Sequence, residues 1–331
     1  MKLRILSEND VRSLMTMREA IDVQAEAFAI LASGAAVDGL RRVVASENPP
    51  GVMIFNPSVL RGGAGFGVKV VSDFYGNEAA GVPRMTALVT LFDGRTGAPR
   101  TVMEGAHLTD LRTGAGTALA ARHLARPDSR TLALFGAGRV ARNQVEGLRA
   151  LLPLERVLVC TRSAARGEAF VAAMPDSGCS FSLVANGAAA VRQADVVVCA
   201  TTATEPVFDG RDLRPGTFVA AAGAYAPDRR EVDTETIRRA ARLVIDSRPD
   251  CLPNAGDLQV PIRAGVIAED AVAGIADVVA GRRPGRQSPD EITYYKSSGV
   301  PIQDLITAQR IEARAIARGI GTLIDIGGDA G

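Results

Sequence analysis

A glycine turn between a strand-like run and a helical stretch constrains the fold of this chain more than any other feature. The apolar run TLALF leads into Gly136 and Gly138, and residues with helical periodicity follow. In this context the first glycine makes a tight turn, the second lets the backbone approach a pyrophosphate, and Ala141 lets helix and strand pack closely. Residues 131–148 therefore predict a dinucleotide-binding loop.

Short apolar runs alternate with helical stretches from Arg130 onward. The runs RVLVC, DVVVCAT, TFVAAAG and RLVID follow the glycine turn, separated by stretches such as AARGEAFVAAM. Such alternation is typical of parallel strands joined by crossover helices. We expect an α/β fold with a doubly wound parallel sheet in this half of the chain.

The first 120 residues have a different pattern. Residues 18–31 are spaced as an amphipathic helix, and the strand-like runs GVMIF, GVKVVS and TALVTLF follow, linked by Gly, Pro and Asp turns. This pattern predicts an α+β domain. A helical stretch at 107–125 leads into the nucleotide-binding half, and a final helix within 299–321 is expected to pack back onto the first domain.

The end of the second strand of the nucleotide-binding half bears on the choice of cofactor. An NAD site usually has an Asp or Glu there that binds the ribose hydroxyls. Glu155 precedes the strand RVLVC and so lies at the wrong end, and the strand is followed by Thr161, Arg162 and Ser163. A carboxylate would repel a 2′-phosphate, whereas an arginine with two hydroxyls would bind it. This favours NADP(H) over NAD(H).

Cationic residues in the first half point to an anionic ligand. Lys69 interrupts the apolar run FGVKVVS, and a buried ammonium needs an anionic partner, which a carboxylate substrate would supply. The alternative is an edge-strand lysine that points to solvent. Arg112 stands at a small-residue helix start, and Arg41 and Arg42 are adjacent in GLRRVVAS.

Composition excludes several classes of partner. The 331 residues carry 38 Lys and Arg against 37 Asp and Glu without a block of one sign, so we expect neither nucleic acid nor a membrane as partner. The N-terminus reaches acidic residues before any signal-length apolar run. The four cysteines are widely spaced without a metal-binding pattern, which indicates reduced thiols and no metal site. We expect a cytoplasmic protein with a small-molecule partner.

Segments spread over nearly the whole chain resemble the ornithine cyclodeaminase and mu-crystallin family. They include GVKVVSDFYGN, LTDLRTGAGTALAARHLA, ALFGAGRVARNQ, ADVVVCATT and KSSGVPIQDL. The resemblance implies a Rossmann domain, residues 121–301, inserted in an α+β substrate-binding and dimerisation domain, residues 1–120 plus 302–331. It also implies a homodimer and the use of NAD or NADP to interconvert amino acids and imines.

The resemblance also implies roles for residues at matching motif positions. Arg41, Lys69 and Arg112 look like the family's carboxylate-binding set, with Arg42 as the neighbouring alternative to Arg41. Ser298 and Gly299 lie in the segment that approaches the nicotinamide in relatives. The implied cofactor contacts are Arg112, Thr113, Gly136, Ala137, Gly138, Arg139, Val140, Thr161, Arg162, Ser163, Thr201, Ser298 and Gly299.

Two departures from the family pattern bear on the reaction. Cyclodeaminases carry an Asp two residues before a proline in the loop after the fifth Rossmann strand, where it handles the substrate amino group. Here Tyr225 stands at that position, with Pro227 fixing the register. The imine-reductase and mu-crystallin branch also lacks this acid. At VPRMT, Arg84 and Met85 replace residues through which many relatives contact the cofactor.

We therefore predict an NADP-preferring reductase of a small imine that bears a carboxylate, such as Δ1-pyrroline-2-carboxylate or Δ1-piperideine-2-carboxylate. Arg41, Lys69 and Arg112 would clamp the carboxylate so that the imine carbon meets the hydride donor. Lys69, the Tyr225 hydroxyl or solvent would deliver the proton. One alternative is an ornithine cyclodeaminase or an alanine-type amino-acid dehydrogenase. Another is a crystallin-like protein that binds NADPH and a small ligand.

Overall fold

A computed structural model describes all residues of the chain except 40, 175–177 and 328–331. The chain forms two compact units, one of Met1–Arg112 with Val300–Gly331 and one of Thr113–Gly299. The second unit is thus inserted into the sequence of the first. The first boundary falls within helix α3 (Ala106–Leu124), ahead of the boundary expected after residue 120.

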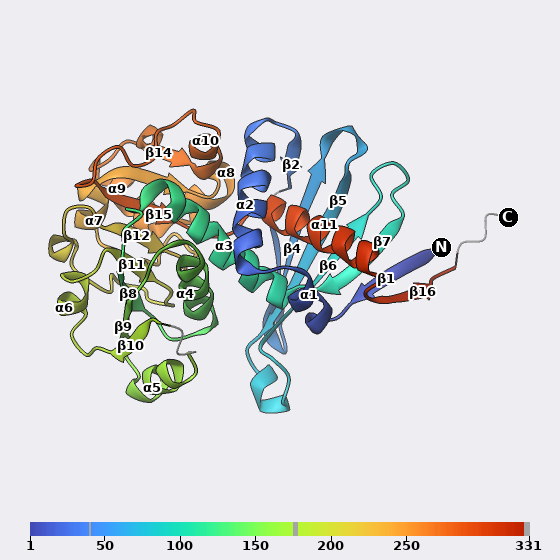
Figure 1. Cartoon of the computed structure of the whole chain (residues 1–331), viewed down its shortest axis with the longest axis horizontal. Coiled ribbons are helices and arrows are strands. Elements are labelled where there is room, and N and C mark those ends of the chain that lie inside the picture. The colour runs from blue at the N-terminus through green and yellow to red at the C-terminus, as the bar shows by residue number, and fades with distance from the viewer. Residues whose placement is uncertain (40, 175–177, 328–331) are drawn as a thin grey trace. The chain divides into compact units, whose positions relative to one another are not determined.

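The inserted unit is built on a sheet of eight strands, all paired in parallel (Figure 1). Their order is β10-β9-β8-β11-β12-β15-β13-β14, so the chain reverses direction across the sheet at β8. β8, β11, β12 and β15 are buried at every residue, as in a sheet with both faces covered. The predicted doubly wound sheet is confirmed. The strands are β8 (Thr131–Phe135), β9 (Arg156–Cys160), β10 (Ser180–Leu183), β11 (Val196–Cys199), β12 (Phe218–Ala221), β13 (Ala240–Ile245), β14 (Val272–Gly274) and β15 (Ile292–Lys296).

Helices and short turns connect these strands. Several helices begin at a side chain that accepts a backbone N–H, as Ser163, Asn186 and Asp233 do. Such caps stabilise the first turns of these three short helices. The helices are α4 (Arg139–Leu151), α5 (Ala164–Ala172), α6 (Gly187–Val191), α7 (Thr234–Arg239), α8 (Arg248–Cys251), α9 (Gly256–Arg263) and α10 (Ile275–Val279), with 3₁₀ turns at Gly210–Asp212, Leu252–Asn254 and Glu269–Ala271.

The other unit contains a mostly antiparallel sheet in the order β16-β1-β7-β6-β5-β4-β2, with β3 paired to β4. The pairing of β1 with β7 is parallel. The three strand-like runs expected in this half lie within β4, β5 and β6. The strands are β1 (Lys2–Leu6), β2 (Ala36–Asp38), β3 (Arg42–Glu47), β4 (Pro50–Leu60), β5 (Gly65–Phe74), β6 (Met85–Phe92), β7 (Pro99–Glu104) and β16 (Thr322–Asp325), with 3₁₀ turns at Arg61–Gly63 and Asn77–Ala80.

Helix α11 (Pro301–Arg318) packs on β4, β5 and β6 (Figure 1). It also contacts two helices of the same unit, α2 (Met17–Ala32) and α1 (Glu8–Leu14). Pro301 starts α11 and Gly319 ends it with a φ of 66°, a left-handed conformation that suits glycine. The C-terminal helix therefore packs onto the first domain, as expected. Its N-terminal half carries the acid described below.

The two faces of this sheet differ. On β5, Gly67, Lys69 and Val71 are buried on the face that α11 covers, because side chains alternate along a strand. On the opposite face Val44, Val59 and Leu88 are 50%, 45% and 55% exposed. This second face, which we call the open face, is apolar and accessible to solvent.

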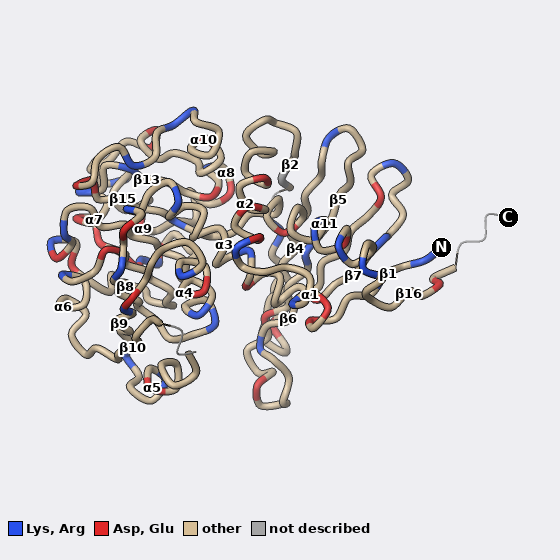
Figure 2. Tube along the Cα trace, in the orientation of Figure 1, with Lys and Arg blue, Asp and Glu red and all other residues tan. Residues whose placement is uncertain are grey.

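Charged residues of both signs are interspersed along the trace of each unit (Figure 2). The distribution agrees with the formal net charge of +1. Among the described helices, none combines the length and the apolar character that a bilayer crossing requires. The four cysteines, Cys160, Cys179, Cys199 and Cys251, are buried and form no disulfide with one another.

Candidate functional site

Glycines shape the loop between β8 and α4. Gly136 has a φ of 111°, and a Cβ there would lie 2.4 Å from the carbonyl oxygen of Ala200. Another residue type would therefore be both strained and crowded. Gly138 caps α4 without a side-chain hydrogen bond, and a Cβ there would meet nothing within 4 Å. The N-terminus of α4 is thus open to an anion such as a pyrophosphate.

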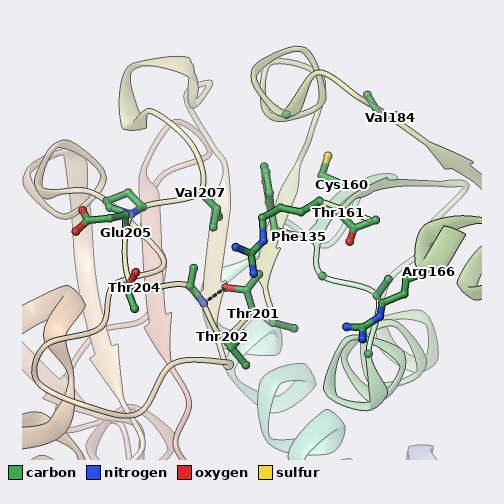
Figure 3. A pocket seen from close by; sticks show the side chains of 18 of the residues that line it. Phe135, Cys160, Thr161, Arg166, Val184, Thr201, Thr202, Thr204, Glu205 and Val207 are labelled. Atoms are coloured by element: carbon green, nitrogen blue, oxygen red, sulfur yellow. Dashed lines mark hydrogen bonds between the residues drawn. The ribbon is translucent and has the colours of Figure 1, made fainter. Parts of the chain in front are cut away.

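A pocket of about 690 Å³ lies at the carboxyl ends of β8, β9 and β11 (Figure 3). This is where the strand order reverses, the place at which open α/β sheets bind their ligands. The pocket, the glycine loop and the open helix end fit a dinucleotide. Of the predicted cofactor contacts, Gly136, Ala137, Gly138, Thr161, Arg162 and Thr201 line it. The others, Arg112, Thr113, Arg139, Val140, Ser163, Ser298 and Gly299, are not among its lining residues.

The part of the pocket next to β9 carries positive charge. Thr161 and Arg162 follow β9, and Arg166 from the first turn of α5 joins them in the lining. Figure 3 shows Thr161 and Arg166 on one side of the pocket and Glu205 on the other. Glu155 lies before β9 in an ion pair with Arg130, at the end of the strand that the sequence indicated. Arg166, which lies in the first turn of α5 four residues after Arg162, was not predicted from the sequence.

A buried carboxylate holds the segment that follows β15. Asp246, which comes directly after β13 and is 1% exposed, accepts hydrogen bonds from the N–H groups of Ser298 at 2.7 Å and Gly299 at 2.6 Å. The hydroxyl of Tyr295 donates to the same carboxylate. Asp246 was not identified from the sequence. It fixes the backbone of the two residues that are predicted to approach the nicotinamide.

Tyr225 lies in the loop after β12. Its hydroxyl accepts a hydrogen bond from the Asn254 side-chain amide at 3.1 Å and donates to the backbone carbonyl of Asp250 at 3.4 Å. The hydroxyl is therefore held by neighbours of its own unit. Its role as a proton donor stays a prediction.

The predicted anion-binding residues of the first unit gather around one carboxylate. Lys69 Nζ lies 2.8 Å from Asp304 Oδ2, and Arg112 Nε lies 2.9 Å from Asp304 Oδ1. Arg41 Nε donates to Asn56 Oδ1 at 3.2 Å, and Asn56 pairs with Lys69 across β4 and β5. Lys69, Arg112 and Asp304 are 3%, 6% and 3% exposed. We call these five residues the cation cluster.

The cation cluster has more positive than negative charge. Two buried cations, Lys69 and Arg112, share one carboxylate, which leaves a surplus of one positive charge when all are ionised. Burial, reinforced by Arg112, lowers the pKa of Lys69 to about 7 against the opposing pull of Asp304. Burial disfavours the Asp304 carboxylate, but Arg112 and Lys69 outweigh it and hold its pKa below the usual value. A second anion would therefore be attracted to the cluster.

Asp304 is the part of this site that sequence reasoning missed. We expected a substrate carboxylate to be the anionic partner of buried Lys69, and the chain itself supplies one. The signal was an acid among the apolar residues Ile302, Leu305 and Ile306 near the start of α11. The structure also separates the two adjacent arginines, because Arg41 joins the cluster while Arg42 is exposed on β3.

Nearly the whole chain matches the sequence profile of one known family. The profile described as "Ornithine cyclodeaminase/mu-crystallin family" covers residues 1–319. The chain belongs to this family. The predicted resemblance is thereby confirmed, and the motifs that carried it lie in both units of this ornithine cyclodeaminase/mu-crystallin family protein.

Three relatives show how far the likeness extends. The chain is 32% identical to Δ1-pyrroline-2-carboxylate reductase of Bacillus cereus over 97% of its own length and 99% of that protein. It is similar to the structure of Thermococcus litoralis Δ1-pyrroline-2-carboxylate reductase in complex with NADH and L-proline, with a TM-score of 0.90, 36% identity, and coverage of 96% and 99% of the two chains. It is also similar to an archaeal alanine dehydrogenase dimer with bound NAD, with a TM-score of 0.90, 33% identity, and coverage of 99% and 100%.

Proposed function

We propose that this protein is a nicotinamide-dependent oxidoreductase that reduces a small carboxylate-bearing imine to the amino acid. Cyclic imino acids such as Δ1-pyrroline-2-carboxylate and Δ1-piperideine-2-carboxylate are the proposed substrates. The observation that carries the proposal is the surplus positive charge of the cation cluster in a chain that also has a dinucleotide pocket. Two of the three relatives described above are named for the reduction of such an imine.

The cation cluster would bind the substrate carboxylate and so restrict the orientation of the imine. Arg112 and Lys69 are fixed by Asp304, so little side-chain freedom is lost when an anion arrives. A bound dinucleotide supplies hydride to the imine carbon. The imine nitrogen gains a proton, and the C=N bond becomes a CH–NH bond. With a pKa of about 7, Lys69 can either hold or release a proton near neutral pH, which makes it a candidate donor beside Tyr225 and solvent.

We further propose a preference for NADP(H) over NAD(H). The support is local to this chain, because Thr161, Arg162 and Arg166 line the pocket after β9 where an NAD site usually has an acid. Two guanidinium groups suit the charge and geometry of a 2′-phosphate. The two solved relatives described above contain NADH and NAD, so the preference rests on these residues and not on the likeness.

A homodimer formed through the open face is part of the proposal. Val44, Val59 and Leu88 expose apolar surface there, and Phe66 and Phe92 stack on it with ring centroids 4.9 Å apart. Large exposed apolar patches mark interaction sites. The alanine dehydrogenase relative is described as a dimer, which supports a second copy of this chain as the occupant. The expected cytoplasmic location fits four buried cysteines that form no disulfide with one another.

The alternative is an amino-acid dehydrogenase or cyclodeaminase that works in the oxidative direction. It is favoured by the likeness to alanine dehydrogenase, and a carboxylate clamp would serve it equally well. Tyr225 opposes the cyclodeaminase reading, since that position carries an acid in the deaminating enzymes that the chain resembles.

The test is an oxidation assay of NADPH and NADH with a panel of imino acids, run beside the reverse assay with alanine, ornithine and proline. We expect faster oxidation of NADPH than of NADH with a cyclic imino acid. Rapid oxidation of alanine or ornithine without reduction of any imine would refute the proposal in favour of the alternative. Binding of NADPH without turnover of any substrate would favour a crystallin-like binding protein.

A further inference from the structure

The carboxylate of Glu231 joins two loops of the dinucleotide-binding sheet. One oxygen accepts the N–H of Thr201 at 2.7 Å and its hydroxyl at 2.9 Å. The other oxygen accepts the N–H groups of Gly223 at 2.8 Å and Ala224 at 2.9 Å. The Glu231 side chain is fully buried. One carboxylate therefore ties together the segments that follow β11 and β12.

The two loops are in close contact at this carboxylate. A Cβ on Gly223 would lie 2.1 Å from the carbonyl oxygen of Thr201 and 2.6 Å from Glu231 Oε1. β11 and β12 are neighbours, with Cys199 paired to Ala221 directly before the loops begin. The contact leaves no room for a side chain or a water molecule between the backbones. A small change at Glu231 would therefore move both loops.

A second carboxylate and a lysine hold Glu231 in turn. Asp257 accepts the backbone N–H of Glu231 at 2.6 Å and that of Val232 at 3.0 Å. Lys296, at the end of β15, lies 2.8 Å from Asp257 and 3.7 Å from Glu231, and all three side chains are at most 1% exposed. Burial raises the pKa of Glu231, while Asp257 and Glu231 together raise the pKa of Lys296 in spite of its burial. The free energy of desolvating three buried charges is offset only by close geometry and by hydrogen bonds such as these.

We infer that Glu231, fixed by Asp257 and Lys296, is a positioning residue for the nicotinamide half of the cofactor. In a doubly wound sheet the half with the glycine loop binds the adenosine side, and the half beyond the switch point binds the other nucleotide. Thr201 lines the pocket on that second half. The hydrogen bonds of the Glu231 carboxylate go to the loops after β11 and β12, so its direct effect falls on the half of the sheet beyond the switch point. The inference rests on the proposed nicotinamide cofactor.

The test is the variant Glu231→Gln, which keeps the size of the side chain. An amide has one accepting oxygen, so one of the two loops would meet an N–H group where it now finds an acceptor. Thr201→Val is a milder second variant in case Glu231→Gln does not fold, because it removes the hydroxyl that donates to Glu231 and accepts the N–H of Ala203 at 3.2 Å. Glu235→Gln is the matched control, because Glu235 forms an ion pair with Arg238 near the surface in the same part of the chain.

Calorimetry would measure the binding of NADPH, NADH and the fragment adenosine 2′,5′-bisphosphate to each protein. We expect Glu231→Gln to weaken the dinucleotides about tenfold or more, Thr201→Val to weaken them less, and both to bind the fragment within about twofold of the wild type. Glu235→Gln should match the wild type for all three ligands. Equal losses for dinucleotide and fragment would mean a general effect on folding and would overturn the inference, as would unchanged dinucleotide binding in both variants.

Hydrogen exchange without any ligand supplies a second readout. The amides of Thr201, Gly223 and Ala224 should exchange faster in Glu231→Gln than in Glu235→Gln, and equal exchange would overturn the inference. These measurements need no turnover. If the wild type reduces no imine while the contrast between dinucleotide and fragment holds, the proposed reaction is wrong and the positioning role stands.

Discussion

Replacement of Lys69 by Met separates a role in anion binding from a role in folding. A pKa that falls from 10.5 to about 7 means that the fold disfavours the charged form of Lys69 by about 5 kcal/mol relative to water. In Lys69→Met, Asp304 keeps Arg112 at 2.9 Å and so remains paired. We therefore expect the free energy of unfolding to stay within about 1 kcal/mol of the wild type, or to rise.

The same replacement should impair catalysis. Removal of one partner of a buried charge pair costs about 2–5 kcal/mol of binding, so kcat/KM for the imine should fall at least about 30-fold, mainly through KM. Steady-state kinetics with Δ1-pyrroline-2-carboxylate measure the loss, and urea unfolding measures the stability. Lys2→Met, at an exposed lysine of β1, is the control and should change neither quantity.

Asp304→Asn removes the negative charge of the cluster, whereas Lys69→Met removes a positive one. Without this carboxylate, the buried cations Lys69 and Arg112 lose the acid that they share, and we expect about 3–5 kcal/mol of destabilisation. The reasoning would be refuted if Lys69→Met destabilised the fold as much as Asp304→Asn did and left kcat/KM within about threefold of the wild type. Lys69 would then be a structural ion-pair partner and not part of an anion site.

Three other predictions concern the protonation of Lys69, the choice between NADPH and NADH, and the oligomeric state. Because Lys69 with a pKa of about 7 is charged below that pH and neutral above it, wild-type kcat/KM should decline as pH rises through about 7. Lys69→Arg should lack this step, since a guanidinium stays charged, and a step shared by both proteins in pH–rate profiles would belong to the substrate instead. Arg162→Asp should weaken NADPH about 100-fold in calorimetry and NADH less than about threefold, because the replacement repels a 2′-phosphate, and equal losses would contradict the NADP preference. Leu88→Lys on the open face should shift the protein from dimer to monomer in sedimentation. The control Val266→Lys, at an exposed valine of the other unit, should leave the dimer intact. A wild type that sediments as a monomer would argue against the proposed interface.

The parts of the structure that follow from local patterns were predictable. The glycine turn, the buried strands after it and the terminal helix were all expected, because each depends on periodicity or on glycine chemistry within a short stretch. The family followed from motifs that extend along the chain and is confirmed by the profile over residues 1–319. The short strand β16 was not expected, since its four exposed residues form a strand only by pairing with β1 at the other end of the chain.

The acids of the site were harder to predict. Lys69 and Asp304 are 235 positions apart, and Asp246 acts on backbone groups more than 50 positions away. No local sequence pattern predicts a partner so far along the chain. An acid in an amphipathic helix is normally expected on the solvent-exposed face. The cations were found because they interrupt apolar runs. Their counter-charges required the fold, since only tertiary packing brings α11 to β5.

Asp304 holds the proposed anion site in place before any ligand binds. Without an internal counter-charge, Lys69 and Arg112 would repel one another until a substrate arrived, and assembly of the site would be coupled to binding. With Asp304 in place the cations are held in the ligand-free protein, so a substrate has no folding step to complete. Association should then be limited by diffusion and docking, and the melting temperature should depend on substrate only through ordinary mass action.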